Sequence, residues 1–187
     1  MLIARSSVQD FHNPVFHRCS VQDPSLYIPL TGHNSSNQIK TVEKIAESRF
    51  PIYRVFCPNQ KSYLAMKVFK CFQGQLNPYF INEARFSSLD HPNIISIKKV
   101  VNQQTILVNG LTSEVSYILM ELAHCDLLHL IGNPYLILDE KLVRTFFHHL
   151  IEGIEYLHKN GVYHMDLKPD NLLLGKDWRL KITDFDM

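Results

Sequence analysis

The chain has 187 residues, of which 45% are hydrophobic and 20% are charged. This composition is ordinary for a folded globular protein. The length is sufficient for one substantial hydrophobic core, or for one and a half small domains. Lysine and arginine number 19 against 18 aspartates and glutamates, and this balance gives no support for a nucleic-acid-binding or membrane-surface protein.

Cysteine usage and apolar patterning indicate the cellular compartment. The four cysteines are widely spaced and form no C-x-x-C pair, which favours free thiols in a reducing compartment over a disulfide framework or a zinc site. No apolar run reaches the roughly 18 residues that a membrane span needs, and the N-terminus lacks the long apolar stretch of a secretory signal. We therefore expect an intracellular, cytoplasmic protein with no membrane or nucleic-acid partner, and its oligomeric state stays open.

The N-terminal half is predicted to contain mostly strands. Residues 1–39 show no sustained period and are rich in proline and polar residues, which indicates a flexible extension. The runs 53–56 and 62–69 flank a turn at 58–60, and this pattern predicts a hairpin.

A helix and two further strands are predicted to follow the hairpin. Asn77 is a plausible N-cap and Pro78 suits the first helical position, so a helix is expected from there to about Leu89. Two more strands are expected near 97–108 and 115–121.

The clearest predicted element is a long helix from Asp139 to Asn160. Apolar residues recur at helical spacing, Asp139 is a plausible N-cap and Gly161 closes the helix. Short strands are expected at 171–174 and 179–183. Strands first, a long helix later and no internal repeat predict an α+β fold.

A few charged and amide side chains lie within or next to the predicted strands and helices. Lys67 lies inside a predicted strand, Glu83 lies in the next helix, and a lysine flanked by apolar residues is costly to bury without a partner. Asn171 and Asp184 offer oxygen atoms suited to magnesium. Asp166 stands two residues before Lys168 and is suited to orient a hydroxyl or accept its proton. These are the parts that phosphoryl transfer requires.

Several motifs occur in an order that resembles the catalytic domain of eukaryotic protein kinases. From about residue 40 to its end, the chain contains A-M-K at 65–67, H-P-N-I-I at 91–95, Y-I-L-M-E at 117–121, H-M-D-L-K-P-D-N at 164–171 and D-F-D at 184–186. Lys168, two residues after Asp166, is typical of kinases that act on serine and threonine.

The resemblance implies a bilobal fold, with a complete N-lobe sheet and one helix over 40–122 and an incomplete helical C-lobe over 123–187. It implies ATP and Mg²⁺ as cofactors and a protein with serine or threonine as substrate. Asp166 and Lys168 would be catalytic, and Asn171 and Asp184 would bind magnesium. The implied ATP-binding residues are Lys67, Glu83, Ala65, Met120, Glu121, Ala123, Asp126 and Leu173.

Several positions depart from the family pattern. The stretch 46–53 lacks all three glycines of the phosphate loop, and Pro51 removes an amide there, while Tyr53 replaces the valine expected over adenine. Asp186 replaces the glycine of D-F-G. His164 is interpreted as a hydrogen-bonded core histidine. Nothing follows Met187, so we expect a truncated kinase that is inactive alone; the alternative is a pseudokinase-like scaffold that binds nucleotides or partners.

Overall fold

The structure is a computed structural model that describes residues 26–27, 40–47, 49–108, 111–136 and 139–185. The strands are β1 (Leu26–Tyr27), β2 (Lys40–Glu47), β3 (Pro51–Cys57), β4 (Ser62–Lys70), β5 (Ile97–Val108), β6 (Leu111–Glu121), β7 (Cys125–Asp126), β8 (Leu172–Leu174) and β9 (Leu180–Ile182). The α-helices are α1 (Pro78–Ala84), α2 (Leu127–Ile131) and α3 (Glu140–Lys159), and short 3-10 turns are η3 (Pro58–Gln60), η4 (Arg85–Ser88) and η5 (Pro169–Asn171).

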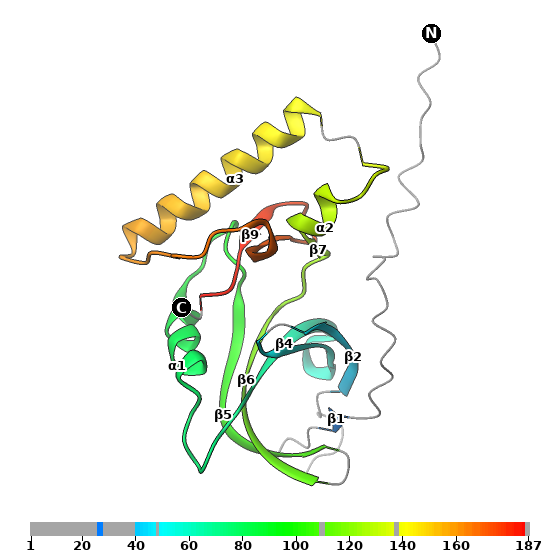
Figure 1. Cartoon of the computed structure of the whole chain (residues 1–187), viewed down its shortest axis with the longest axis vertical. Helices are drawn as coiled ribbons and strands as arrows, with labels where there is room; N and C mark the ends of the chain where they lie inside the picture. Colours follow the sequence, from blue (N-terminus) through cyan, green and yellow to red (C-terminus); the bar gives the residue numbers. More distant parts are fainter. Residues whose placement is uncertain (1–25, 28–39, 48, 109–110, 137–138, 186–187) are drawn as a thin grey trace.

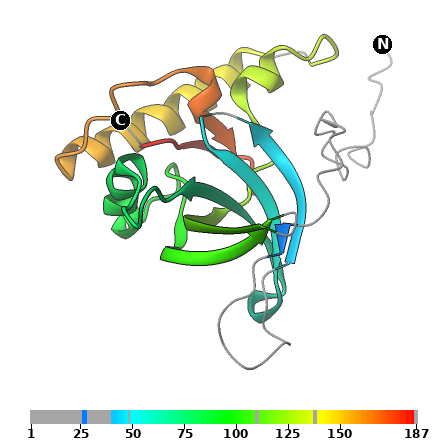
Figure 2. The same cartoon turned by 60° about the horizontal axis from the view of Figure 1, so that its bottom comes forward.

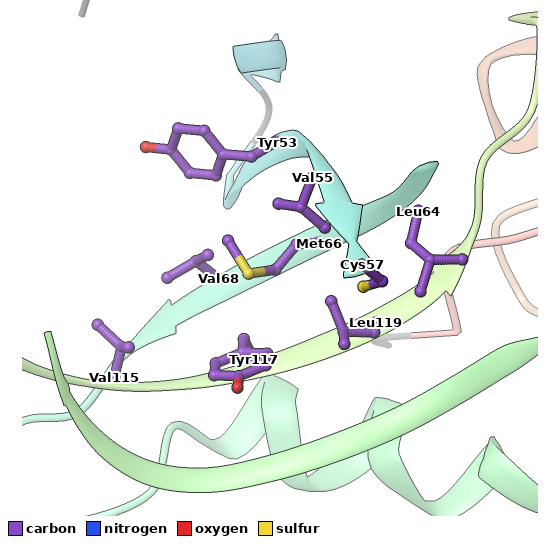
Figure 3. Close-up of a cluster of buried hydrophobic side chains, with 9 residues drawn as sticks. All are labelled: Tyr53, Val55, Cys57, Leu64, Met66, Val68, Val115, Tyr117 and Leu119. Atoms are coloured by element: carbon purple, nitrogen blue, oxygen red, sulfur yellow. The ribbon is translucent and has the colours of Figure 1, made fainter. Parts of the chain in front are cut away.

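An antiparallel sheet forms the N-terminal part of the molecule (Figure 1). Its strands follow the order β1-β2-β3-β4-β6-β5 and close into a barrel. Successive side chains alternate between the two faces of each strand. One face therefore carries a buried apolar cluster, which Figure 3 shows. Its members are Tyr53, Val55, Cys57, Leu64, Met66, Val68, Val115, Tyr117 and Leu119.

The opposite face of the same sheet packs against α1, which lies beside β5 (Figures 1 and 2). This second cluster contains Phe50, Ala65, Phe69, Phe80, Ile95, Ile118 and Met120. Aromatic packing joins the two elements, because the rings of Phe69 in β4 and Phe80 in α1 meet edge to face with centroids 5.5 Å apart. The helix is thereby fixed against the strand that carries Lys67.

The C-terminal part consists of α2, α3 and the small sheet β7-β8-β9. Asp139 caps α3 by accepting a hydrogen bond from the Leu142 amide at 2.7 Å, and Gly161 adopts a φ of +71° just beyond its end. Buried side chains of α3, β8 and β9 share one core with the loop before β5: Ile94, Phe146, Leu157, Leu172, Leu174, Leu180, Ile182 and Phe185.

The loop 91–95 joins the two parts through backbone hydrogen bonds. The Ile95 amide donates to the Ile182 carbonyl at 2.9 Å, and the Ile182 amide donates to the Asn93 carbonyl at 2.9 Å. Gly153 of α3 lies close to this loop, since a Cβ atom at Gly153 would lie 3.1 Å from the Asn93 carbonyl oxygen. A side chain at this position would require the helix, the loop or the Ile182 side chain to shift by a few tenths of an ångström.

The fold agrees with the α+β prediction, and the hairpin of β3 and β4 and the long helix α3 are found where they were expected. The predicted helix from 78 to about 89 is shorter: α1 ends at Ala84 and continues as the 3-10 turn η4. Its last turns hold Ser87 and Ser88, which favour turns over helix interiors. Strand β6 begins four residues earlier than predicted, at Leu111 rather than 115, because it pairs with β5 along its whole length.

The flexibility predicted for residues 1–39 stays a prediction, but two of these residues lie in a strand. Leu26 and Tyr27 form β1, which pairs with Val108 and Leu107 of β5, because the edge of that strand offers unpaired backbone groups. Residues 1–25 and 28–39 lie outside the described residues. Within the described ranges, no helix has both the length and the apolar character that crossing a membrane requires.

Candidate functional site

Lys67 projects from β4 on the face that packs against α1. It pairs with Ile52 of β3 and Ile118 of β6, so it lies in the middle of the sheet with a strand on either side. Only 3% of the residue is exposed. An ammonium group in such a place needs compensating negative charge.

Two carboxylates supply that charge. The Lys67 ammonium donates to Glu83 Oε2 at 2.7 Å and to Asp184 Oδ1 at 2.6 Å. Burial alone would lower the pKa of Lys67, but the two carboxylates together raise it above its ordinary value. Lys67 is therefore a fixed cation, and it brings together a strand, a helix and the segment after β9.

The local sequence of α1 explains how Glu83 reaches the lysine. The Asn77 side chain caps the helix by accepting from the Tyr79 amide at 3.0 Å, and Pro78 occupies the first turn. Phe80 and Glu83 are three residues apart and share the buried face of the helix. The phenyl ring anchors the helix while the carboxylate meets Lys67, so the spacing sets the ion pair.

Asp184 adopts an unusual backbone conformation. Its φ is +72°, in the left-handed region that an aspartate tolerates better than most residues. The side chain is 35% exposed, in contrast to the buried Lys67 and Glu83. Asp184 is thus the member of this ion-pair group that faces solvent.

A second polar group forms on the turn before β8. The Lys168 ammonium donates to Asp166 Oδ2 at 2.6 Å, and the Asn171 amide donates to the same oxygen at 3.2 Å and to the Asp166 backbone carbonyl at 2.9 Å. The hydrogen bond from Lys168, with that from Asn171, lowers the pKa of Asp166 below its ordinary value. Asp166 is therefore an ionised carboxylate held in one orientation.

His164 supports this turn from within the core. Its Nδ1 accepts a hydrogen bond from the Asp166 amide at 3.3 Å, so Nε2 carries the proton and donates to the Thr183 carbonyl at 2.8 Å. Only 6% of the residue is exposed. His164 thus links the turn carrying Asp166 to the segment carrying Asp184, which agrees with the predicted core histidine.

An apolar group lies where the sheet meets the C-terminal part. Ala65 and Met120 are buried in the same cluster that Ala123 and Leu173 pack against. Ala65 and Met120 are direct partners across β4 and β6, and Leu173 pairs with Asp126 across β7 and β8. The structure therefore brings together Ala65, Met120, Ala123 and Leu173, four of the residues that the sequence assigned to a base-binding site.

Polar backbone groups are available beside this apolar group. Among the residues that the structure describes, none accepts a hydrogen bond from the Ala123 amide, whereas the next amide, of His124, donates to the Leu174 carbonyl at 2.7 Å. The Asp126 carboxylate caps α2 by accepting from the His129 amide at 2.6 Å. An exposed amide next to apolar side chains suits an adenine ring, which presents a ring nitrogen as an acceptor.

A partly buried ion pair fixes the segment before Ala123. Lys181 of β9 donates to Glu121 Oε1 at 3.0 Å and Oε2 at 3.1 Å, and Oε1 also accepts the Ser96 amide at 2.8 Å. The sequence analysis did not identify Lys181. Its signal was a lysine between Leu180 and Ile182 in a short apolar strand, the same signal that marked Lys67.

One expectation about this site is wrong. Tyr53 was expected over the adenine, but its side chain belongs to the buried cluster that Figure 3 shows, whereas Ala65 belongs to the cluster on the other face of the sheet. The register explains the difference, because Ala65 is paired with Arg54 and paired residues project to the same face. Asp186 lies outside the described residues.

Comparison with known proteins places these motifs in a family. A family model described as the protein kinase domain matches residues 51–187. The chain belongs to the protein kinase family. Sperm motility kinase 2B of Mus musculus is 34% identical over 126 residues, which cover 66% of this chain and 24% of that protein. CTD kinase subunit alpha of Saccharomyces cerevisiae is 29% identical over 163 residues, covering 83% of this chain and 29% of that protein.

A third relative agrees over a shorter stretch. The CBL-interacting serine/threonine-protein kinase 8 of Arabidopsis thaliana is 56% identical over 48 residues, which cover 26% of this chain and 11% of that protein. The chain spans 24% of the length of the first of these relatives and 29% of the length of the second.

Protein kinases generally use ATP and Mg²⁺, and the residues present fit both. The described residues contain no cluster of three or more His, Cys, Asp or Glu side chains that would hold a metal alone. Magnesium in kinases is held by few protein oxygens together with substrate phosphates. Asp184 fits this pattern, since in the described part of the chain only its Oδ1 is engaged, by Lys67.

Proposed function

We propose that this chain contributes the nucleotide site and catalytic turn of a serine/threonine protein kinase that transfers a phosphoryl group from ATP to protein hydroxyls. Residues 40–122 would form its N-lobe and residues 123–187 its share of the C-lobe. The observation that carries the proposal is the convergence of Glu83 and Asp184 on Lys67, with the turn of the orientated Asp166 tied through His164 to the segment that carries Asp184.

Each side chain has a role that follows from its place. Ala65, Met120 and Leu173 would enclose the adenine, and the backbone of Glu121 and Ala123 would hydrogen-bond its edge. Asp126 would lie near the ribose, because it pairs with Leu173. Mg²⁺-ATP, when bound, supplies the transferable phosphoryl group and a metal that neutralises charge on the phosphate oxygens.

The remaining roles concern phosphate, metal and hydroxyl. Lys67 would hold the phosphates, with Glu83 keeping its ammonium in place, and Asn171 and Asp184 would bind magnesium. Asp166 would orient the substrate hydroxyl and accept its proton as the bond to phosphorus forms. The lowered pKa of Asp166 keeps it ionised for that task, and Lys168 would steady the transferring group.

We place the protein in the cytoplasm. The described cysteines Cys57, Cys71 and Cys125 are free thiols, which suits a reducing compartment. The protein substrate would be recognised through a serine or threonine hydroxyl.

A second candidate function is a scaffold that binds partners without transferring phosphate. The observation that favours it is the phosphate-loop segment, which has no glycine, and the burial of Phe50 against Lys67. Transfer is favoured because a scaffold has no need for an orientated Asp166 or a paired Asp184. The polar residues that point to transfer are Lys67, Asp166, Lys168, Asn171 and Asp184.

A thermal-shift titration of the full chain tests the proposal. ATP is expected to raise the melting temperature more strongly when magnesium is present, and the Asp184→Asn variant is expected to lose that dependence. Asp177→Asn is the matched control, because Asp177 is about half exposed in the turn before β9 and should leave the shift unchanged. A folded chain that shows no magnesium-dependent shift would instead support the scaffold.

A further inference from the structure

The side chain of Phe50 lies on the face of the sheet that carries Lys67. Ile52 pairs with Lys67, and Phe50 stands two residues earlier on the same face of the chain entering β3. The same register brings Phe50 to Phe69 of β4, and their ring centroids are 4.6 Å apart. Phe50 is 8% exposed, so it is a core residue although it stands at the tip between two strands.

This ring completes an enclosure around the Lys67 ammonium. Glu83 and Asp184 occupy two sides of Nζ, while the rings of Phe50 and Phe69 have centroids 5.8 Å and 5.5 Å from it. The lysine side chain is 4% exposed. A phosphate group therefore has no access to Lys67 unless one of these neighbours moves.

A second contact holds the tip of the segment on α1. The Arg49 guanidinium lies 4.5 Å from the ring centroid of Tyr79, and the ring of Phe50 lies 5.5 Å from the same tyrosine. Contacts of this kind are individually weak where they are exposed to solvent, so the tip of the segment can be displaced from α1.

The sequence gives a reason for this arrangement. Glycines at such a tip let backbone N–H groups approach phosphate oxygens, but here the tip has none, and Pro51 has no N–H to donate. Glu47 and Pro51 pair across β2 and β3, so the connection between these two strands is short. Phe50, the residue before β3, therefore lies against the sheet. A side chain thus occupies the region that backbone amides would otherwise present to phosphate.

We propose that Phe50 is a specificity-determining residue of the nucleotide site: its ring closes Lys67 off from phosphate, so the site accepts the nucleoside as readily as the nucleotide. The inference rests on the proposed nucleotide site. The contact of Arg49 with Tyr79 keeps the ring in place, and displacement of Phe50 is the step that admits the phosphates.

Isothermal titration calorimetry of the full chain with adenosine and with Mg²⁺-ATP tests this proposal. For the wild type, the two ligands are expected to bind with similar dissociation constants. In Phe50→Ala, ATP should bind about tenfold more tightly while adenosine is unchanged, because one aromatic contact no longer competes with phosphate. Phe72→Ala is the matched control, since Phe72 is 75% exposed and lies away from Lys67.

Arg49→Gln is a second variant, because loss of the buried Phe50 ring itself risks unfolding. It removes the contact with Tyr79 at the surface, and about a threefold gain in ATP affinity is expected. Arg144→Gln, on the exposed side of α3, is its control. The proposal would be overturned if the wild type bound ATP much more tightly than adenosine and Phe50→Ala weakened ATP binding. The Phe50 ring would then stabilise the bound phosphates instead of excluding them.

The position of the ring can also be followed without any nucleotide. The chain has one tryptophan, Trp178, so Phe50→Trp in a Trp178→Phe background gives a single reporter. Acrylamide should quench its fluorescence weakly, and adding Arg49→Gln should increase the quenching severalfold. Strong quenching with Arg49 intact would contradict the closure. If neither ligand binds any variant, the proposed nucleotide site fails, and the quenching result still decides whether Phe50 closes Lys67.

Discussion

Replacing Glu83 with glutamine removes one of the two charges that compensate the buried Lys67. The substitution preserves the volume of the side chain, so packing against Phe80 and the sheet is retained. It leaves an ammonium group in a nearly inaccessible place, with both Lys67 and Glu83 side chains 4% exposed. The expected effect is therefore electrostatic, and its size can be worked out from the remaining contacts.

Removal of one partner of a buried ion pair typically costs about 3–5 kcal/mol. Asp184 still lies 2.6 Å from the ammonium, so we expect the lower end of that range, about 3 kcal/mol. For a chain of this length, each kcal/mol lowers the melting temperature by about 2–4 °C, and the expected decrease is therefore roughly 6–12 °C.

Urea unfolding followed by circular dichroism measures the free energy, and differential scanning calorimetry measures the melting temperature. Glu140→Gln is the control, because Glu140 pairs with Arg144 at 2.6 Å on the surface of α3, where both side chains are 78% exposed. Such a surface pair should contribute less than about 0.5 kcal/mol. Equal effects of Glu83→Gln and Glu140→Gln would refute the reasoning, because burial of the charge would then be irrelevant.

Three further predictions follow from other buried positions. Burial, with Cys57 nearby, raises the pKa of Tyr117 to about 12. The free energy of unfolding is therefore highest below the unfolded-state pKa of about 10 and decreases by about 2–3 kcal/mol as the pH rises above it. Urea unfolding at pH 11 should show that Tyr117→Phe removes this decrease, whereas Tyr135→Phe, at a 92% exposed residue, does not. Gly153→Ala gains about 1 kcal/mol of helix propensity but costs about 1–3 kcal/mol of overpacking, so calorimetry should show a lower melting temperature; a higher one would contradict the close approach. Glu121→Ala should speed hydrogen exchange of the Ser96 amide at least about tenfold, since the amide loses its carboxylate acceptor, and unchanged exchange would argue against that bond.

The elements that sequence patterns predicted well are those whose signals are local. The long helix α3 has a capping aspartate, a helical apolar period and a closing glycine, and it begins and ends where these residues stand. The end of α1 was missed because the stretch after Ala84 keeps a helical spacing of apolar residues, while Ser87 and Ser88, which favour turns, lie in η4.

The candidate site was predicted in part, for a related reason. Lys67 and Glu83 attract attention because a charge within an apolar stretch implies a partner, and the structure pairs them. The bond between Glu121 and Lys181 joins residues 60 positions apart and depends on how the small sheet sits against β6. The face on which Tyr53 lies depends on strand register, and a shift of one residue reverses it. No local sequence pattern specifies the pairing of Glu121 with Lys181 or the face on which Tyr53 lies.

The backbone bonds between loop 91–95 and β9 constrain how the molecule opens. The chain passes from the barrel to the small sheet at residues 122–124, and the loop meets β9 at a separate place through Ile95 and Asn93. Two such attachments define a line, and any opening around Lys67 that preserves both must be a rotation about that line, which also separates Lys67 from Asp184. Sliding of one part over the other would break the bonds to Ile182, so the motion available to this protein has a single principal axis.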